Sequence, residues 1–115
     1  MTASCMFCKI ANNESKAEIV YRDEEVTAFR DIHPVAPIHI LIIPNRHIES
    51  ANEIKSEDQL LVGHMIFTAR QLAAREGIDK DGYRLIMNTG PRGGQTVFHM
   101  HVHLIGQRQM HWPPG

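Results

Sequence analysis

The segment 98–104, FHMHVHL, constrains the fold more than any other part of the chain. Apolar residues and histidines alternate in it with the two-residue period of a β-strand. The pattern therefore predicts a strand, which we place at 96–106. Its apolar face would pack on a core and consists of Phe98, Met100, Val102 and Leu104. Its other face, which must be wet, bind a ligand or both, carries His99, His101 and His103.

Three histidines on one strand face allow three interpretations. One metal ion bound by all three is disfavoured, because His99 and His103 would lie about 13 Å apart along a strand, although two neighbours could share an ion. A plain solvent-facing row would more usually contain Lys, Glu or Thr. A row of imidazoles along a phosphate-bearing substrate fits the spacing best, since neutral imidazole is nucleophilic and imidazolium donates to oxyanions.

The loop before this strand also favours a phosphate. Its sequence, GPRGGQT at 90–96, contains glycines whose amides can approach a phosphate closely, and Gln95 and Thr96 would add donors. Taken alone, the loop is explained at least as well by a hairpin turn with two glycines. The neighbouring histidines make us prefer the phosphate interpretation.

The remaining segments predict an α+β fold with a mostly antiparallel sheet of about five strands. In the long helix, Ser56 and Gln59 predict a capping box and Gly77 predicts the C-terminal stop. The predicted elements are a short helix at 5–11, strands at 18–23, 25–31, 38–44, 83–88 and 96–106, and a long helix at 56–77.

Composition limits the class of protein. The chain has 115 residues, 43% of them apolar, and a formal net charge of −1, which suits one domain over 1–115 and gives no reason to expect nucleic-acid binding. The first residues show no signal-peptide pattern, and the apolar run at 38–44 is too short to span a membrane. Two cysteines, Cys5 and Cys8, fit a reducing cytoplasm better than a disulfide framework.

Longer stretches resemble the histidine triad (HIT) nucleotide-binding family. The triad motif, His-φ-His-φ-His-φ-φ with φ apolar, is matched by HMHVHLI. The Hint branch of the family is similar to FCKI, to AFRDIHPVAPIHILIIPNRHI and to GGQTVFHMHVHLIGQRQMHWPPG, so the resemblance covers nearly the whole chain. It implies a HIT-like fold whose sheet continues across a homodimer.

The resemblance implies a hydrolase that cleaves the P–N bond of purine nucleoside phosphoramidates. His101 would attack the α-phosphorus and form a covalent nucleotidyl-histidine, which water then hydrolyses. His103, His99 and His39 would belong to the same catalytic site, and the sequence leaves open which group protonates the leaving amine. Alternatives are a dinucleoside polyphosphate hydrolase, a nucleotide-binding or scaffold protein with weak catalysis, and a metal-dependent hydrolase.

A nucleoside site is implied by the same resemblance. Asp31 would accept the ribose hydroxyls and Asn88 would reach the phosphate side, while apolar side chains, which plain core packing explains equally well, would wall the base slot. The implied nucleotide-binding residues are Phe7, Ile10, Phe29, Asp31, Ile32, Leu41, Asn88, Gly94, Gln95, Thr96, Val97, His101, His103 and Trp112.

The two cysteines resemble those of a zinc-carrying subset of the family. The ligands in that subset are two cysteines, the histidine of an IPxxH segment and the first triad histidine, which correspond here to Cys5, Cys8, His47 and His99. Two sulfurs and two imidazoles make a closed tetrahedral site, so this Zn²⁺ would be structural and would take His99 out of catalysis. Two free thiols remain an alternative, and a thioredoxin-like redox pair is disfavoured because only four residues precede Cys5.

The tail at 107–115 shows no strand pattern after Gln109, and its prolines block a helix. Trp112 would bury a large area if it docked. The resemblance implies that the tail reaches the active site of the partner subunit, in a dimer that also covers open sheet edges.

Overall fold

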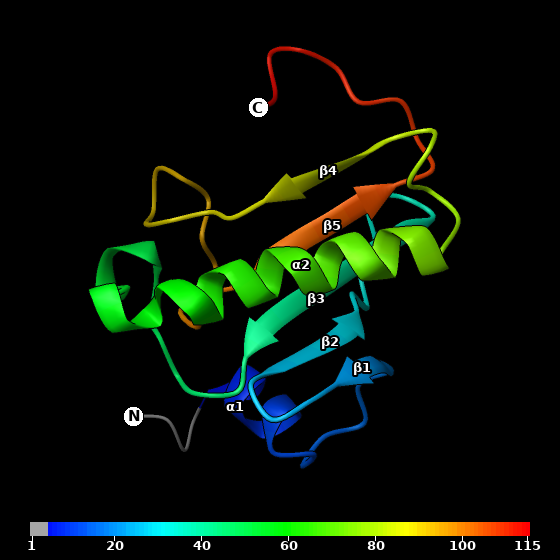
Figure 1. Cartoon of the computed structure of the whole chain (residues 1–115). Coiled ribbons are helices and arrows are strands. Elements are labelled where there is room, and N and C mark those ends of the chain that lie inside the picture. Colours follow the sequence, from blue (N-terminus) through cyan, green and yellow to red (C-terminus); the bar gives the residue numbers. More distant parts are fainter. Residues whose placement is uncertain (1–4) are drawn as a thin grey trace.

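Five strands form one antiparallel sheet in the order β1-β2-β3-β5-β4, and a long helix lies across one face of it (Figure 1). The computed structural model describes residues 5–115. Its helices and strands are α1 (Met6–Ala11), β1 (Ile19–Arg22), β2 (Val26–Arg30), β3 (Ile38–Pro44), α2 (Gln59–Arg75), β4 (Tyr83–Ile86) and β5 (Val102–Gly106), with two short 3-10 turns at Ala51–Glu53 and Ser56–Asp58. The predicted α+β class, the antiparallel sheet and both helices are confirmed.

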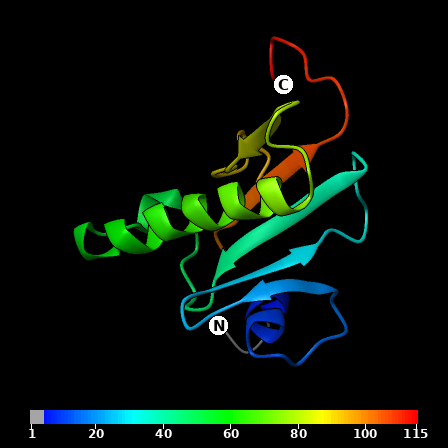
Figure 2. The same cartoon turned by 45° about the vertical axis from the view of Figure 1, so that its right-hand side comes forward.

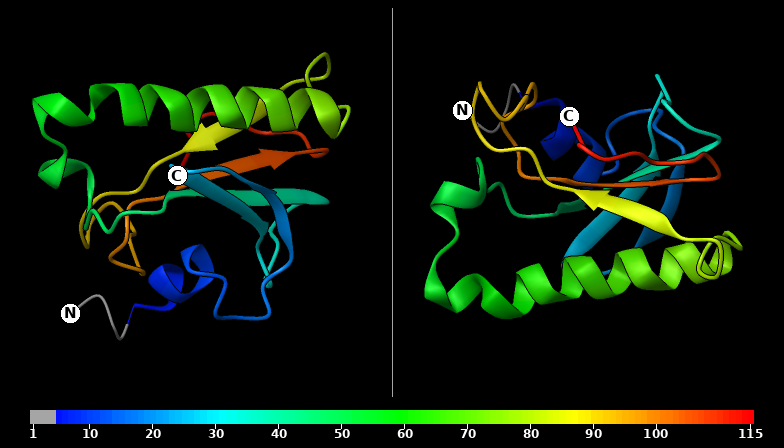
Figure 3. Two further views of the ribbon diagram at one scale, coloured as in Figure 1. Left: turned by 60° about the horizontal axis from the view of Figure 1, so that its bottom comes forward. Right: turned by 90° about the horizontal axis from the view of Figure 1, so that it is seen from above.

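Strand β3 is buried on both faces, because the two helices lie on opposite sides of the sheet (Figure 3). On one face Ile40 and Ile42 pack against α2, in a core that includes Met65. On the other face Leu41 and Ile43 pack against α1. This two-sided burial explains why the strand reads as a nearly continuous apolar run.

Helix α2 begins differently from the prediction and ends as predicted. The Asp58 carboxylate accepts the main-chain N–H of Lys55 at 2.9 Å and pairs with Arg46, so the chain enters the helix through a 3-10 turn. The predicted capping box at Ser56 is therefore wrong. At the other end Gly77 has φ +78°, and the N–H of Ile78 bonds the carbonyl of residue 73 at 3.0 Å in a Schellman motif.

Strand β5 is shorter than predicted, because it starts at Val102 rather than at residue 96. Its partner β3 ends at Pro44, whose carbonyl accepts a hydrogen bond from the His99 side chain at 2.8 Å. His99 and His101 therefore lie in the segment before the strand, and only His103 of the three histidines is part of β5. Met100, Val102 and Leu104 face the core as predicted, whereas Phe98 is 47% exposed and the prediction for it is wrong.

The histidine face is not a wet strand surface. His99 is fully buried and His101 is 5% exposed. Helix α1 covers them, and the ring of its Phe7 packs edge-on against both. This excludes the interpretation of a plain solvent-facing row. Among residues 5–115, no helix has the length and apolar character that crossing a membrane requires.

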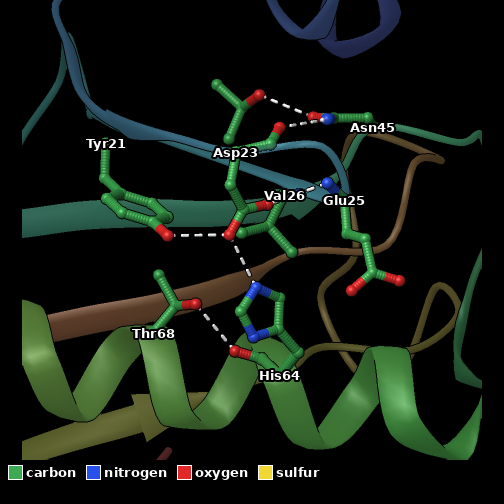
Figure 4. A network of polar contacts seen from close by, with 8 residues as sticks. Tyr21, Asp23, Glu25, Val26, Asn45, His64 and Thr68 are labelled. Carbon is green, nitrogen blue, oxygen red and sulfur yellow. Dashed lines mark hydrogen bonds and ion pairs between the residues drawn. The ribbon is translucent and has the colours of Figure 1, made fainter.

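A half-buried carboxylate, that of Asp23, ties the hairpin of β1 and β2 to α2 (Figure 4). One Asp23 oxygen accepts the main-chain N–H groups of Glu25 and Val26, each at 2.8 Å. The other accepts the Tyr21 hydroxyl and the His64 Nε2–H, each at 2.7 Å. Burial alone would raise the pKa of the Asp23 carboxyl, but these four hydrogen bonds outweigh it and hold the pKa well below its usual range.

We predict that Asp23→Asn destabilises the protein by about 1–3 kcal/mol at pH 7, because an amide cannot accept four hydrogen bonds. A carboxyl with a lowered folded-state pKa stabilises fully above its unfolded pKa of about 3.9, and this stabilisation is lost as the pH falls towards the folded pKa. Urea unfolding at pH 7, 5 and 3 should therefore show a difference that shrinks only below about pH 4. The control is Glu24→Gln at the exposed neighbouring carboxylate; a difference independent of pH would contradict the prediction.

Candidate active site

A cleft of about 370 Å³ opens between α1, the β2–β3 loop and the segment before β5. Apolar side chains form most of its wall, and the polar groups come from three histidines, an aspartate, an arginine and a threonine. Ten of the predicted nucleotide-binding residues line it: Phe7, Ile10, Phe29, Asp31, Ile32, Leu41, Thr96, Val97, His101 and His103. A slot with an apolar wall and a few polar groups suits a flat base joined to a polar sugar phosphate.

His101 presents one nucleophilic nitrogen. Its Nδ1 lies 2.7 Å from the carbonyl oxygen of His99, which can only accept, so Nδ1 carries the proton and Nε2 keeps its lone pair. Burial lowers the pKa of His101, so its ring is neutral at pH 7. The ring of Phe7 packs edge-on against it, with 5.1 Å between centroids.

His39 and His103 form a second oriented pair. The main-chain N–H of Val35 donates to Nδ1 of His39 at 3.2 Å, so the proton of the neutral His39 ring is on Nε2. That Nε2 lies 2.9 Å from Nδ1 of His103, which must then accept. Burial lowers the pKa of both rings, that of His103 to about 4, so both are neutral at pH 7. His103 is left with a proton on Nε2 that it can donate.

Asp31 sits at the mouth of the same pair. One of its carboxylate oxygens accepts the main-chain N–H of His33 at 2.8 Å, and the other lies 3.4 Å from Nε2 of His39. The side chain is 20% exposed, so the carboxylate retains room for a ligand hydroxyl. A carboxylate oxygen accepts well from a diol.

Polar groups of the glycine-rich loop form hydrogen bonds within the protein itself. The Gln95 side chain accepts the N–H of Gly90 at 2.9 Å and donates to the carbonyls of Glu49 and Val97 at 2.8 and 3.2 Å. The N–H of Gly94 donates to the carbonyl of residue 91 at 3.1 Å. These bonds favour the hairpin-turn interpretation for the loop itself, and a contact of Gln95 or Gly94 with a phosphate stays a prediction.

Other predicted residues also lie outside the cleft lining. Among residues 5–115, the predicted nucleotide-binding residues that do not line it are Asn88, Gly94, Gln95 and Trp112. Trp112 is 83% exposed and has not docked on its own subunit. The tail is hydrogen-bonded to the rest of the chain at two places: Arg84 donates to the carbonyl of His111 at 2.8 Å, and Arg108 donates to the carbonyl of Val35 at 2.9 Å.

The predicted metal ligands come together in one cluster of Cys5, Cys8, His47 and His99, whose ligating atoms lie within 4.8 Å of one another. Nδ1 of His99 is 3.4 Å from each sulfur, and Nδ1 of His47 is 3.2 Å from the Cys8 sulfur. Tetrahedral zinc with its usual bond lengths would place sulfur and nitrogen ligands roughly 3.5 Å apart. The spacing therefore suits a metal without rearrangement.

Two further observations fit a metal at this cluster. Nε2 of His99 must donate to the Pro44 carbonyl at 2.8 Å, so the lone pair is on Nδ1 and points at the sulfurs. Burial and the neighbouring Cys5 raise the pKa of the Cys8 thiol to about 11, which shows that two adjacent thiolates would need a cation beside them. The cluster could therefore hold a metal ion.

A second cluster, Asp31, His39 and His103, also brings three potential ligands within 4.8 Å. Here the hydrogen bonds argue against a metal. Nε2 of His39 holds the proton that bonds His103, and moving it to Nδ1 would set two N–H groups against each other at Val35. This cluster is a proton-bearing pair beside a carboxylate.

The sequence analysis missed four residues that line the cleft: Met6, Ala17, Arg30 and His33. Two of them flank Asp31 closely in the stretch FRDIHP, and that proximity was an available signal. The groups that orient the histidines are main-chain atoms of Val35, Pro44 and His99. Main-chain atoms leave no signal in a sequence, because every residue carries them.

Comparison with known proteins identifies the family. A model described as the HIT domain matches residues 12–110. The chain belongs to the HIT family. Among its relatives, the purine nucleoside phosphoramidase of Escherichia coli K12 is 51% identical over 110 residues, which span 96% of this chain and 92% of that protein.

Solved HIT structures agree with the fold. The crystal structure of a HIT family hydrolase from Legionella pneumophila Philadelphia 1 superposes with a TM-score of 0.96 at 48% identity, covering 97% of this chain and all of that one (100%). A zinc-bound histidine triad family protein from Mycobacterium smegmatis superposes with a TM-score of 0.81 at 33% identity, covering 94% of this chain and 78% of that one.

Proposed function

We propose that this HIT protein hydrolyses purine nucleoside phosphoramidates, with His101 as the nucleophile. The observation that carries the proposal is the 2.7 Å hydrogen bond from His101 Nδ1 to the His99 carbonyl, which leaves a neutral ring with a free Nε2 in the cleft. The 51% identity to a purine nucleoside phosphoramidase supports this choice of substrate over a dinucleoside polyphosphate.

The proposed reaction has two steps. The lone pair on His101 Nε2 attacks the α-phosphorus, the P–N bond breaks, and the amine leaves with the proton that the N-protonated substrate brings. Water then attacks the nucleotidyl-histidine and releases the nucleoside monophosphate, which restores the neutral imidazole. His103 Nε2–H and the Thr96 hydroxyl, which both face the cleft, would stabilise the developing charge on the phosphoryl oxygens.

The rest of the cleft would hold the nucleoside. Phe7, Phe29 and Leu41 lie against one another in the wall beside α1, where a purine ring could stack. Asp31 would accept the ribose hydroxyls through the carboxylate that is still partly exposed. Asn88 and Gly94 lie outside the cleft lining, so we leave them out of the proposed nucleotide site.

We predict that wild-type protein hydrolyses adenosine 5′-phosphoramidate in excess chelator, and that His101→Ala lowers kcat at least about a thousandfold. Release of AMP measures turnover, and calorimetry with AMP checks that the variant still binds nucleotide. Immediate loss of wild-type activity on chelation would indicate a metal-dependent hydrolase instead. Inactivity of both proteins with intact AMP binding would indicate a binding module, and a fully active variant would exclude His101 as the nucleophile.

We also propose that the four-residue cluster binds a structural Zn²⁺ through Cys5, Cys8, His47 and His99. The donor set leaves no position for a substrate, so the ion would pin α1 to the sheet. Because His99 also accepts the His101 hydrogen bond through its carbonyl, the same ion would steady the nucleophile indirectly. A thiol pair that holds a metal needs a reducing compartment, so we propose a cytoplasmic location.

Cys8→Ser should reduce bound zinc from one ion per chain to none and lower the melting temperature. If metal affinity falls a thousandfold, about 4 kcal/mol of stabilisation is lost. Elemental analysis and thermal unfolding measure the two effects. Wild type treated with chelator should unfold at the same melting temperature as the variant. Equal zinc content in variant and wild type would refute the proposed site.

A homodimer is our third proposal for this protein. Strand β4 is an edge strand, and the tail with exposed Trp112 runs on its side of the sheet (Figure 2). On α2, Leu60 and Phe67 are 89% and 50% exposed and lie seven residues apart on one face. Gly63 lies between them, although glycine weakens a helix, and within residues 5–115 nothing stands within 4 Å of the space for its side chain. A second α2 helix packed closely here would explain this apolar face.

Gly63→Leu should convert the dimer to a monomer without unfolding the subunit, because leucine suits a helix and the isolated subunit has room for it. Sedimentation velocity should show twice the 13.1 kDa chain mass for wild type and the single mass for the variant. Lys16→Leu, which adds an exposed leucine elsewhere, serves as the control. A variant that still sediments as a dimer would place the interface elsewhere.

A further inference from the structure

In the loop between β2 and β3, Val35 is hydrogen-bonded both to His39 of the histidine pair and to the C-terminal segment. Its main-chain N–H donates to Nδ1 of His39 at 3.2 Å. Its carbonyl accepts from Nε of Arg108 at 2.9 Å. The Val35 side chain itself is 55% exposed, so its main-chain groups make the contacts that matter here.

The Val35 amide decides where the His39 proton lies. A neutral imidazole has one nitrogen that donates and one that accepts, and an N–H aimed at Nδ1 requires Nδ1 to accept. The proton is then on Nε2, 2.9 Å from Nδ1 of His103. His103 must accept there, so its own proton is on Nε2. One main-chain amide therefore determines the tautomers of two rings in series.

Two neighbouring groups act on the same pair. The Asp31 carboxylate lies 3.4 Å from Nε2 of His39 and also favours a proton on that nitrogen. Arg108 holds the Val35 carbonyl, which restrains an otherwise exposed loop so that the Val35 amide stays aimed at the ring. With Asp31 alone, Nδ1 of His39 would lack a donor and the loop would be free to turn away.

We propose that the Val35 amide, held by Arg108, fixes the His39–His103 tautomers and so keeps the Nε2–H of His103 available as a hydrogen-bond donor to the phosphoryl group of the substrate. Val35 and Arg108 are positioning residues, because they act through His39. The inference rests on the proposed phosphoramidate hydrolysis. In the first step, His103 Nε2–H donates a hydrogen bond to a phosphoryl oxygen as negative charge develops there.

The decisive pair of variants is Val35→Pro and Val35→Ala. Proline removes the N–H, whereas alanine keeps it and shortens only an exposed side chain. In long-range ¹H–¹⁵N spectra of histidine rings, wild type and Val35→Ala should show His103 protonated on Nε2, and Val35→Pro should show mixed tautomers. The kcat of Val35→Pro should fall at least about tenfold with KM nearly unchanged, since a positioned hydrogen-bond donor to a developing oxyanion contributes about 10²–10³-fold.

Arginine variants test whether the bond from Arg108 to the Val35 carbonyl holds the Val35 amide in place. Arg108→Gln should shift the tautomers in the same direction and lower kcat, and Arg108→Lys should restore part of both. The matched control is Arg75→Gln, which removes another exposed arginine that donates to a main-chain carbonyl, that of Val20. If Val35→Pro loses its dispersed NMR spectrum, the Arg108 series decides the question alone.

Identical tautomers and kcat in Val35→Pro and Val35→Ala would contradict the proposal that the Val35 amide fixes the two rings. So would an Arg108→Gln variant that behaves like Arg75→Gln. If wild type releases no AMP from the phosphoramidate, the proposed function fails, while the ring spectra of the variants still test the tautomers. The two failures are therefore distinguishable.

Discussion

The hydrogen bond from His99 Nε2 to the carbonyl of Pro44 holds the rest of the site together. It ties the segment before β5 to the last residue of β3, and it turns His99 Nδ1 towards the two cysteines. The carbonyl of the same residue then accepts the His101 proton. One fully buried imidazole thus links the sheet, the metal cluster and the nucleophile, so damage to any of the three should be felt by the others.

Strand β3 carries this arrangement because both of its faces are covered. Its residues alternate between the α2 core and the cleft side, where His39 and Leu41 lie among the residues of the proposed site. A strand buried on both sides has little freedom to shift register, since a slip of one residue would exchange a histidine for an isoleucine in the cleft. The precision of the His39–His103 contact therefore derives from the packing of the whole sheet.

The histidines are useful because they are neutral. Burial lowers the pKa of His39, His101 and His103, so each ring at pH 7 has one donor and one acceptor nitrogen. Hydrogen bonds with main-chain groups then determine which ring nitrogen carries the proton. In this arrangement a nucleophile and a hydrogen-bond donor can be the same residue type, two positions apart, and still have opposite roles.

Much of the fold and part of the site could be predicted from the sequence. The alternation at 98–104 correctly placed Met100, Val102 and Leu104 in the core, and the apolar run at 38–44 correctly predicted β3. The four residues that resembled zinc ligands do meet, although up to 94 positions separate them.

Local pattern failed where the outcome depended on distant partners. Strand β5 starts at Val102, opposite Ile42, and the chain before it is held instead by the bond from the His99 side chain to the Pro44 carbonyl. The Gln95 side chain bonds within the loop and to the Glu49 carbonyl that lies beside it. Residue types and their spacing thus determined which side chains are available and which faces they share. Only the tertiary structure decided where each strand ends and which ring nitrogen holds a proton, because those depend on main-chain groups that every residue carries and that folding alone brings into contact.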